Sequence, residues 1–302
     1  MKKPFFSIIL PTFNREQSIQ KCIKSVLNQS FEDYELIIID NKSTDNTLHL
    51  IENFNDKRIQ LISNDKNYER CYSRNKGIEN ANGKYITFID SDDEFEIYHL
   101  ENWFHFIQSQ TDNEVFFIGQ KKIKKYNEEI LETPFFDYKK NVDFIDYPVI
   151  PGQTCFPKKI LENYKFNNKY LIFEDTALWL QISTEFNFKT TTLNTYIYVI
   201  DDNNSVNISK NNVGSIRYQS INNFMIENEK LIQNIGKNHF NKELSNSLFQ
   251  TAKYYLANKK RVNAILYIIK SIIQKPSSFQ LKHKSLLIFK LILNKEIPEY
   301  GF

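Results

Sequence analysis

Tyr85-Ile86-Thr87-Phe88-Ile89-Asp90-Ser91-Asp92-Asp93 (residues 85–93) is the stretch around which this chain is organised, since its apolar run ends in three carboxylates within four residues. The β-branched and aromatic run predicts a buried strand of an α/β sheet. Three unpaired acids at a strand end repel one another, and burying them would cost several kcal/mol each. A divalent cation with oxygen ligands would remove that cost, and ligands of open α/β sheets bind at the carboxyl ends of strands. The stretch therefore predicts a metal-bound ligand at this place, with a solvated acidic turn as the alternative.

The residues before this stretch predict a doubly wound fold. Apolar runs indicate strands over 5–10, 34–39 and 58–63, and helical spacing indicates helices over 19–27, about 43–54 and 68–80. Alternating strands and helices are typical of α/β folds with a parallel sheet. Pro11 cannot donate to a central ladder, so it should mark the exit of the first strand. The absence of GxGxxG, GxxxxGK[ST] and Gly-x-Ser-x-Gly motifs argues against dinucleotide-binding, P-loop and α/β-hydrolase sites.

The residues after this stretch are less regular. We expect a helix over 97–110, single strands over 114–125 and 188–200, a return to the sheet near 152–157, and a helix from Glu174. Asp93 should be a supporting partner in the site or the N-cap of the helix over 97–110. Residues 126–150 show no clean periodicity, and we expect an irregular acceptor-side segment there. The chain is helical from Val213 on, with candidate helices over 216–232, 244–256, 262–273 and 281–293.

The composition of the chain bears on its surface charge and on its cellular compartment. The chain has 302 residues, 41% apolar, and a net charge of +3. Residues 251–302 hold ten Lys and Arg against two Glu, a net +8, so the rest of the chain carries a net −5. Three cysteines without metal spacing indicate reduced thiols in the cytoplasm. We expect neither a signal peptide nor a spanning helix, since no apolar run is long enough.

Six motifs in this order resemble those of family 2 glycosyltransferases. They are SIILPTFNR (7–15), SVLNQSF (25–31), IDNKSTD (39–45), SRNKGI (73–78), GKYITFIDSDD (83–93) and FEDTALWL (173–180). The resemblance covers roughly residues 5–205. It implies the GT-A fold, which is a Rossmann-like, mostly parallel central sheet with flanking helices. It also implies an inverting glycosyltransferase of the bacterial surface-polysaccharide type.

The resemblance assigns the nucleotide to the ends of the first two strands. Pro11, Thr12, Phe13 and Arg15 would lie at the exit of the first strand, where Phe13 offers a ring face to uracil or, alternatively, packs in the core. Asp40 and Asn41 stand where the family usually has Asp-Asp. Asn41 donates and accepts hydrogen bonds but carries no charge, so the chain departs from the family pattern at a position that commonly contacts the base or ribose.

The resemblance also assigns the diphosphate, the metal and the catalytic base. Arg74 would lie near the diphosphate, or else form a surface ion pair. Asp90-Ser91-Asp92 matches the DxD motif, with Asp92 as the main ligand of Mn²⁺ or Mg²⁺ and Asp90 on ribose or metal-bound water. Asp175 would be the base that takes the proton of the acceptor hydroxyl, supported by Glu174. Both acids would also suit the first turn of a helix without any catalytic role.

One departure from the family pattern leaves a second reading open. Val199 and Asp201 stand where relatives commonly have Arg and His. The expected function is transfer of a hexose or N-acetylhexosamine from a UDP-sugar to a saccharide of lipopolysaccharide or capsule. The alternative is a catalytically impaired saccharide-binding or scaffold protein of the same fold. A sugar nucleotidyltransferase is a further rival, but 11–15 lacks the glycine-rich loop of that class.

We expect a catalytic domain over 1–210 and a helical region over 211–302. The basic, apolar helices of the second region fit either a peripheral contact with an anionic membrane or a hairpin packed on the catalytic domain with solvated lysines. The expected location is the cytoplasm, with peripheral contact at the inner face of the cytoplasmic membrane as an option. The expected partners are a nucleotide sugar and a saccharide or lipid-linked saccharide acceptor, and no nucleic acid.

Overall fold

The computed structural model describes residues 3–111, 115–125, 128–200, 212–275, 284–288 and 291. The chain forms two compact units, which are described separately below. The first contains residues 1–168 and 178–201, and the second contains 169–177 and 202–302.

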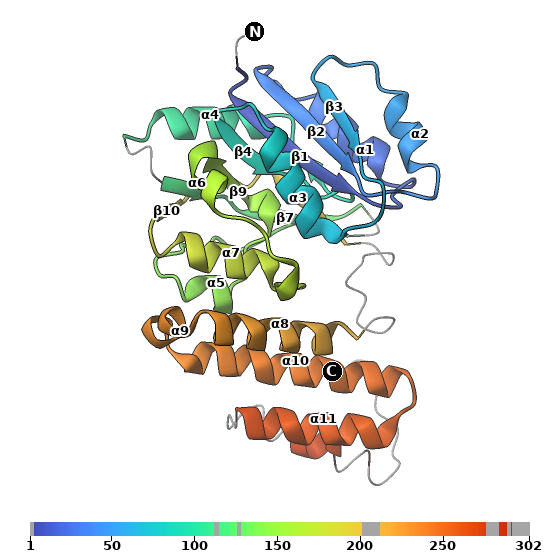
Figure 1. The fold of residues 1–302 in the computed structure, drawn as a ribbon, viewed down its shortest axis with the longest axis vertical. Helices are drawn as coiled ribbons and strands as arrows, with labels where there is room; N and C mark the ends of the chain where they lie inside the picture. Colours follow the sequence, from blue (N-terminus) through green and yellow to red (C-terminus); the bar gives the residue numbers. More distant parts are fainter. Residues whose placement is uncertain are drawn as a thin grey trace. The chain divides into compact units, whose positions relative to one another are not determined.

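A seven-stranded sheet forms the centre of the first unit (Figure 1). In spatial order its strands are β10 (Asn187–Thr190), β6 (Val115–Ile118), β9 (Thr154–Pro157), β4 (Tyr85–Phe88), β1 (Phe6–Thr12), β2 (Tyr34–Asp40) and β3 (Ile59–Ser63). All neighbouring pairs are parallel except the two that involve β9. The predicted α/β fold with a mostly parallel sheet and a helical C-terminal region is confirmed.

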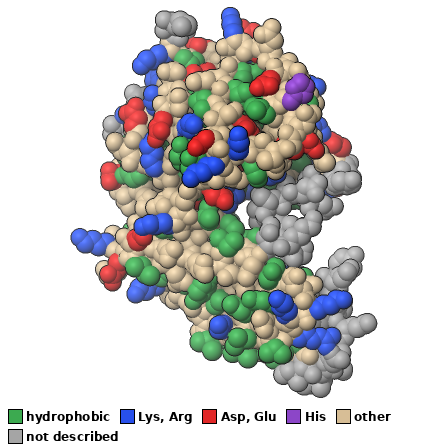
Figure 2. Space-filling model, turned by 45° about the vertical axis from the view of Figure 1, so that its right-hand side comes forward, with side chains coloured by type: hydrophobic (Ala, Val, Ile, Leu, Met, Phe, Trp, Pro, Cys, Tyr) green, Lys and Arg blue, Asp and Glu red, His purple; other side chains and the backbone are tan. Residues whose placement is uncertain are grey.

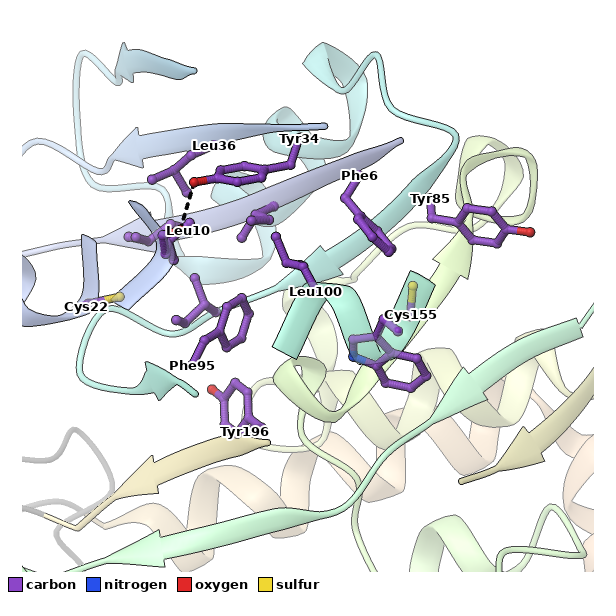
Figure 3. Packing of buried hydrophobic residues seen from close by; sticks show 14 of the residues in the cluster. Phe6, Leu10, Cys22, Tyr34, Leu36, Tyr85, Phe95, Leu100, Cys155 and Tyr196 are labelled. Carbon is purple, nitrogen blue, oxygen red and sulfur yellow. Dashed lines mark hydrogen bonds between the residues drawn. The ribbon is translucent and has the colours of Figure 1, made fainter. Parts of the chain in front are cut away.

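Helices cover both faces of this sheet, which is why its central strands are apolar throughout. On one face, α1 (Ile19–Leu27) and α4 (His99–Gln108) pack in one core with the side chains of Phe6 and Leu10, as Figure 3 shows for part of that cluster. The hydroxyl of Tyr34 in the same cluster donates to the carbonyl of Val26 at 2.8 Å (Figure 3). The three cysteines all lie among the described residues, are buried, and form no disulfide.

Helix α3 (Glu69–Asn80) covers the other face, in close contact with β1. A Cβ atom at Gly77 would lie 2.4 Å from Cγ2 of Ile9, so any larger residue would force the helix away from the strand. Two short helices, α2 (Thr47–Glu52) and α6 (Lys158–Asn163), complete this part of the unit.

A second, four-stranded sheet corrects two predictions. Its strands are, in order, β5 (Glu94–Phe95), β11 (Tyr196–Val199), β7 (Lys121–Lys124) and β8 (Ile130–Glu132). The single strands predicted over 114–125 and 188–200 are wrong, because each segment divides between the two sheets. Between β6 and β7, the amide of Gly119 donates to the carbonyl of Gln153 and that of Gln120 to Leu193, both at 2.7 Å. These bonds turn the chain out of the main sheet.

The second unit contains four well-described helices. They are α8 (Val213–Glu227), α9 (Glu229–Ile235), α10 (Lys237–Ala257) and α11 (Arg261–Gln274), and residues 284–288 and 291 are also helical. The single helix predicted over 216–232 is wrong, since the chain breaks at Asn228 into α8 and α9. The helix predicted over 281–293 lies partly outside the described residues. Among the helices that are described, none is both long and apolar enough to cross a membrane.

Candidate active site

The carboxyl ends of β1, β2 and β4 meet at one edge of the main sheet. Thr12 at the end of β1 is paired with Asp40 at the end of β2, and the amide of Asn41 donates to the carbonyl of Thr12 at 2.8 Å. On the other side of β1, the amide of Ile89 donates to the carbonyl of Ile9 at 3.0 Å. The residues that follow β4 therefore leave the sheet beside the end of β1, where open α/β sheets bind ligands.

Residues 90–93, which we call the acid loop, join β4 to β5, and each of its two partly exposed acids faces an arginine. Nη2 of Arg74, on α3, lies 2.9 Å from Oδ1 of Asp90. Nη2 of Arg15, which follows β1, lies 3.6 Å from Oδ2 of Asp92. The side chain of Arg74 is 3% exposed and that of Asp90 is 30% exposed, so the arginine is fixed while the carboxylate still reaches solvent. This edge thus presents alternating positive and negative groups.

The third acid of the loop, Asp93, is buried and connects the loop to β11 of the second sheet. Its carboxylate accepts hydrogen bonds from the Tyr196 hydroxyl and, at 2.9 Å, from the amide of Val199. Burial and the charges of Asp90 and Asp92 raise the pKa of Asp93 well above its usual range. The alternative that Asp93 caps the following helix is wrong, because α4 begins at His99 and its N-cap is Tyr98.

Tyr196 and Gly152 are not among the site residues predicted from the sequence, although residues 152–157 are expected to return to the sheet near the site. A Cβ atom at Gly152 would lie 1.9 Å from Cε2 of Tyr196, so the ring fills the space that a side chain there would need. Strand alternation puts Tyr198 on the same face as Tyr196. Burial and then the charges of the acid loop raise the pKa of Tyr198 to about 12. The alternation of side chains along β11 could have indicated that Tyr196 and Tyr198 share a face. Nothing in the sequence indicated that Asp93 is the partner of Tyr196.

The acid loop also contacts α1 and the residue before it, the N-cap Ser18. The Ser18 hydroxyl donates to the carbonyl of Ser91 at 2.9 Å, and Sγ of Cys22 lies 3.5 Å from the carbonyl of Asp90. Ser91 is buried, so its backbone is fixed by α1 while the carboxylates on either side of it point to the arginines.

The exit of β1 carries an exposed ring and a buried hydroxyl. Phe13 is 37% exposed, so it is not a core residue. Thr12 is buried, yet among the described residues its hydroxyl has no hydrogen-bond partner. Buried hydroxyls without a partner are uncommon, and a bound ligand is one way to satisfy them. Pro11 lies inside β1 rather than after it. The ladder between β1 and β4 ends at Ile9, so the N–H that Pro11 lacks is not needed on that side.

The ends of β2 show how this chain uses Asp40 and Asn41. Asp40 is buried and accepts from the amide of Ser43 at 3.2 and 3.3 Å. The Asn41 oxygen accepts from Nδ2 of Asn64 at 2.9 Å and from the amide of Tyr68 at 3.0 Å. Its Nδ2 donates to Asn67 at 2.6 Å. The Asn41 amide therefore holds the loop after β3 in place, which a carboxylate could not do for the Asn67 oxygen.

Glu174 and Asp175 form the first turn of α7 (Glu174–Ile182), and this turn belongs to the second unit. Glu174 is buried and Asp175 is half-buried. Ile172, just before the turn, has a φ of +65°, a strained conformation for a β-branched residue. The roles of Glu174 and Asp175 remain predictions from the sequence. Asp201 lies outside the described residues.

The acid loop suits a divalent cation only with help from a ligand. The described residues contain no group of three or more His, Cys, Asp or Glu arranged to hold a metal. Asp90 and Asp92 offer two carboxylates, and Mg²⁺ sites that also bind phosphates commonly use one or two carboxylates and complete the shell with phosphate oxygens and water. The donor set therefore fits a metal–diphosphate complex.

Comparison with known sequences decides the family. The model of Glycosyl transferase family 2 matches residues 7–164, just over half of the chain. The chain belongs to glycosyl transferase family 2. This family 2 chain is 33% identical over 202 residues to the GalNAc(5)-diNAcBac-PP-undecaprenol beta-1,3-glucosyltransferase of Campylobacter jejuni, which covers 61% of the chain and 62% of that relative. The match thus spans less than two thirds of the relative's length.

A second relative agrees with the family, and a solved structure agrees with the fold. The chain is 31% identical over 181 residues to the UDP-Glc:alpha-D-GlcNAc-diphosphoundecaprenol beta-1,3-glucosyltransferase WfaP of Escherichia coli, covering 58% of the chain and 69% of the relative. Among solved structures, S. aureus TarS 1-349 in complex with UDP is similar with a TM-score of 0.62 at 18% identity, covering 95% of this chain and 87% of the other. At that identity the structural likeness supports the fold alone.

Proposed function

We propose that this chain is an inverting, metal-dependent glycosyltransferase that moves a hexose or N-acetylhexosamine from a UDP-sugar to a saccharide acceptor of a surface glycan such as lipopolysaccharide or capsule. The observation that carries the proposal is the pairing of Arg74 with Asp90 and of Arg15 with Asp92 at the carboxyl edge of the sheet. A metal diphosphate offers the same two kinds of charge. Its phosphate oxygens match the arginines, and its cation matches the carboxylates.

In this proposal the donor is held along the ends of β1, β2 and β4. The exposed ring of Phe13 stacks on the base, and the free hydroxyl of Thr12 bonds to it or to the ribose. Asp40 lies at the same edge. Asp90 and Asp92 would hold Mn²⁺ or Mg²⁺, which when bound stabilises the negative charge of the diphosphate.

The acceptor side depends on Asp175. Its carboxylate takes the proton of the acceptor hydroxyl, whose oxygen forms a bond to the anomeric carbon as the bond from that carbon to the UDP oxygen breaks. The electron pair of the broken bond stays on the diphosphate, where Arg74 stabilises it. One displacement of this kind inverts the anomeric centre. Glu174, which is buried, would orient Asp175.

The names of the relatives point to an acceptor class. Both transferases described above are named for undecaprenol-linked saccharides. We therefore propose a saccharide on a lipid diphosphate as the acceptor. The donor screen below identifies the sugar transferred.

The test is a screen of UDP-sugars with Mn²⁺, read first as a shift in thermal unfolding and then as release of UDP with a lipid-linked disaccharide. We expect one donor to stabilise the chain and to be turned over. Asp175→Asn should keep the stabilisation and lose transfer by about 10²- to 10⁴-fold, the usual contribution of a general base.

Glu229→Gln is the matched control, because Glu229 is also an acid in the first turn of a helix of the second unit. It separates loss of a base from loss of a favourable helix-end charge. Full transfer by Asp175→Asn would refute the base assignment. Tight glycan binding without UDP release from any donor would favour the scaffold alternative.

A further inference from the structure

The outer face of α11 carries a row of exposed apolar side chains. They are Val262, Leu266, Ile269 and Ile273, which are 80%, 49%, 41% and 74% exposed. Their spacing of four, three and four residues places them on one side of the helix, and we call them the α11 stripe. The row is about 16 Å long, at a rise of about 1.5 Å per residue.

The stripe is separate from the face by which α11 packs. The buried residues of the helix are Ala264, Ile268 and Ser271, and Ser271 contacts α10 through a bond from the Ser245 hydroxyl to its carbonyl at 2.8 Å. Ile268 belongs to a core with Ala252 of α10. The helix is therefore apolar on two sides, and among the described residues of the second unit only its inner side is buried.

All the charged residues of α11 and of the described turn before it are positive. Lys259, Lys260 and Arg261 are exposed at the start of the α11 stripe, and Lys270 is exposed beside the stripe. The 52 residues from Leu244 to Lys295 contain ten Lys and Arg and no Asp or Glu. Figure 2 shows hydrophobic side chains gathered over the lowest part of the helical unit among Lys and Arg side chains.

We propose that the outer face of α11 lies on an anionic lipid bilayer, with the α11 stripe among the upper acyl chains and the four cations at the lipid phosphates. An apolar stripe flanked by cations on a helix is the arrangement of an interfacial helix. Anionic lipid attracts each such cation, and several act together. A second copy of the chain fits this face poorly, since two such faces would bring like charges together.

The structure narrows the membrane contact that the sequence suggests for the basic, apolar helices of the second region. Lys284 is buried, and its ammonium group donates to the hydroxyls of Ser245 at 3.0 Å and Ser271 at 2.5 Å. It belongs to the interior of the helical unit and is not available to lipid. The bilayer contact is therefore assigned to α11 and the residues just before it. It does not depend on which donor or acceptor the chain uses.

The experiment is sedimentation of the full chain with vesicles of phosphatidylcholine alone or mixed with phosphatidylglycerol. We expect binding to the mixed vesicles, weakening as salt is raised. The double variant Val262→Ser/Ile273→Ser should bind at least about tenfold more weakly. Ile226→Ser is the matched control, because Ile226 is 77% exposed on α8 of the same unit, and it should bind like the unmodified chain.

A second variant tests the charges. Lys259→Gln/Lys260→Gln/Arg261→Gln should weaken binding to the mixed vesicles by about two orders of magnitude, since each cation near an anionic surface contributes about fivefold. Binding to neutral vesicles should not change.

Three results would overturn the proposal. One is no binding of the unmodified chain to mixed vesicles. Another is an equal loss in Ile226→Ser and in the stripe variant. The last is a stripe variant that dissociates an oligomer, measured by light scattering, while vesicle binding is unchanged, which would assign the face to a second copy. Thermal unfolding of each variant confirms that it is folded.

Discussion

The acid loop and the outer face of α11 carry charge in opposite ways. In the acid loop, Asp90 and Asp92 each face an arginine, and Asp93 accepts bonds from Tyr196 and Val199. On α11, cations surround an exposed apolar row, within 52 residues that contain no acid at all.

The difference indicates two kinds of partner. Paired charges of both signs have fixed positions, and each group can exchange its partner for a ligand group of the same sign, so they suit a small ligand of defined geometry. Charges of one sign spread around an apolar row have no fixed partner geometry, so they suit an extended surface with diffuse opposite charge. The predictions below test each side of this comparison.

The largest effect is expected in the acid loop. Asp92→Asn should lower the rate of UDP release with donor and acceptor by about 10³-fold, because it removes a metal ligand from the proposed site. The free energy of unfolding, measured in urea, should change by less than about 1 kcal/mol, since the ion pair with Arg15 is partly exposed.

Asp56→Asn is the control for that prediction. The side chain of Asp56 is also 23% exposed and also paired with an arginine, Arg58, at 2.7 Å, but it lies before β3 at the opposite edge of the sheet. An equal loss of transfer activity in the two variants would contradict the role of Asp92 as a metal ligand.

On α11 the inner and outer faces should respond differently to substitution. Ile268→Ala should cost about 2–5 kcal/mol of unfolding free energy, because Ile268 is fully buried. Val262→Ser should change it by less than about 0.5 kcal/mol. Urea unfolding of both variants gives the comparison. A cost for Val262→Ser near that of Ile268→Ala would mean that the stripe is part of a packed core.

Tyr196→Phe tests whether Asp93 positions the acid loop. The variant keeps the ring beside Gly152 but leaves a buried carboxylate oxygen without its donor, which should cost about 1–3 kcal/mol of unfolding free energy. It should also lower kcat/KM for transfer. Tyr34→Phe is the control, since that buried hydroxyl donates to a backbone carbonyl away from the site. An equal fall in kcat/KM in both variants would indicate a general loss of packing in the first unit and would contradict a specific role of the Tyr196–Asp93 bond.

The smallest effect concerns the pH dependence of stability that results from His99, which packs against β5 of the second sheet. His99 is buried, stacks on Phe95 with ring centroids 3.8 Å apart, and has its pKa lowered to about 3 by burial. In the unfolded chain its pKa is about 6.5. Between these values the unfolded chain binds a proton that the folded chain excludes, so stability falls as pH falls, by about 1.4 kcal/mol per pH unit below 6.5.

Urea unfolding at pH 7 and pH 5.5 should show a smaller loss in His99→Gln than in the unmodified chain. His105→Gln is the control, because the side chain of His105 is 70% exposed on the same helix. The same pH dependence in all three proteins would show that His99 is not the group responsible.

The sequence alone determined the alternation of strands and helices through β4 and placed the acids at a strand end. It could do so because these strands are buried on both faces, which leaves uninterrupted apolar runs between polar loops. The sequence did not show that β6 and β7, or β10 and β11, are separate strands. A segment that passes from one sheet to the other keeps a strand-like composition on both sides of the break.

Only the tertiary structure decided the partners of the acids and the exposed side of α11. The bonds from Tyr196 and Val199 to Asp93 join residues more than 100 positions apart, and no local pattern encodes such a contact. Helix α11 is apolar on two sides, so its periodicity does not reveal which side packs. Contact with α10 buries Ile268 and leaves Val262 exposed, because a helix that meets its neighbour on one face can bury only that face.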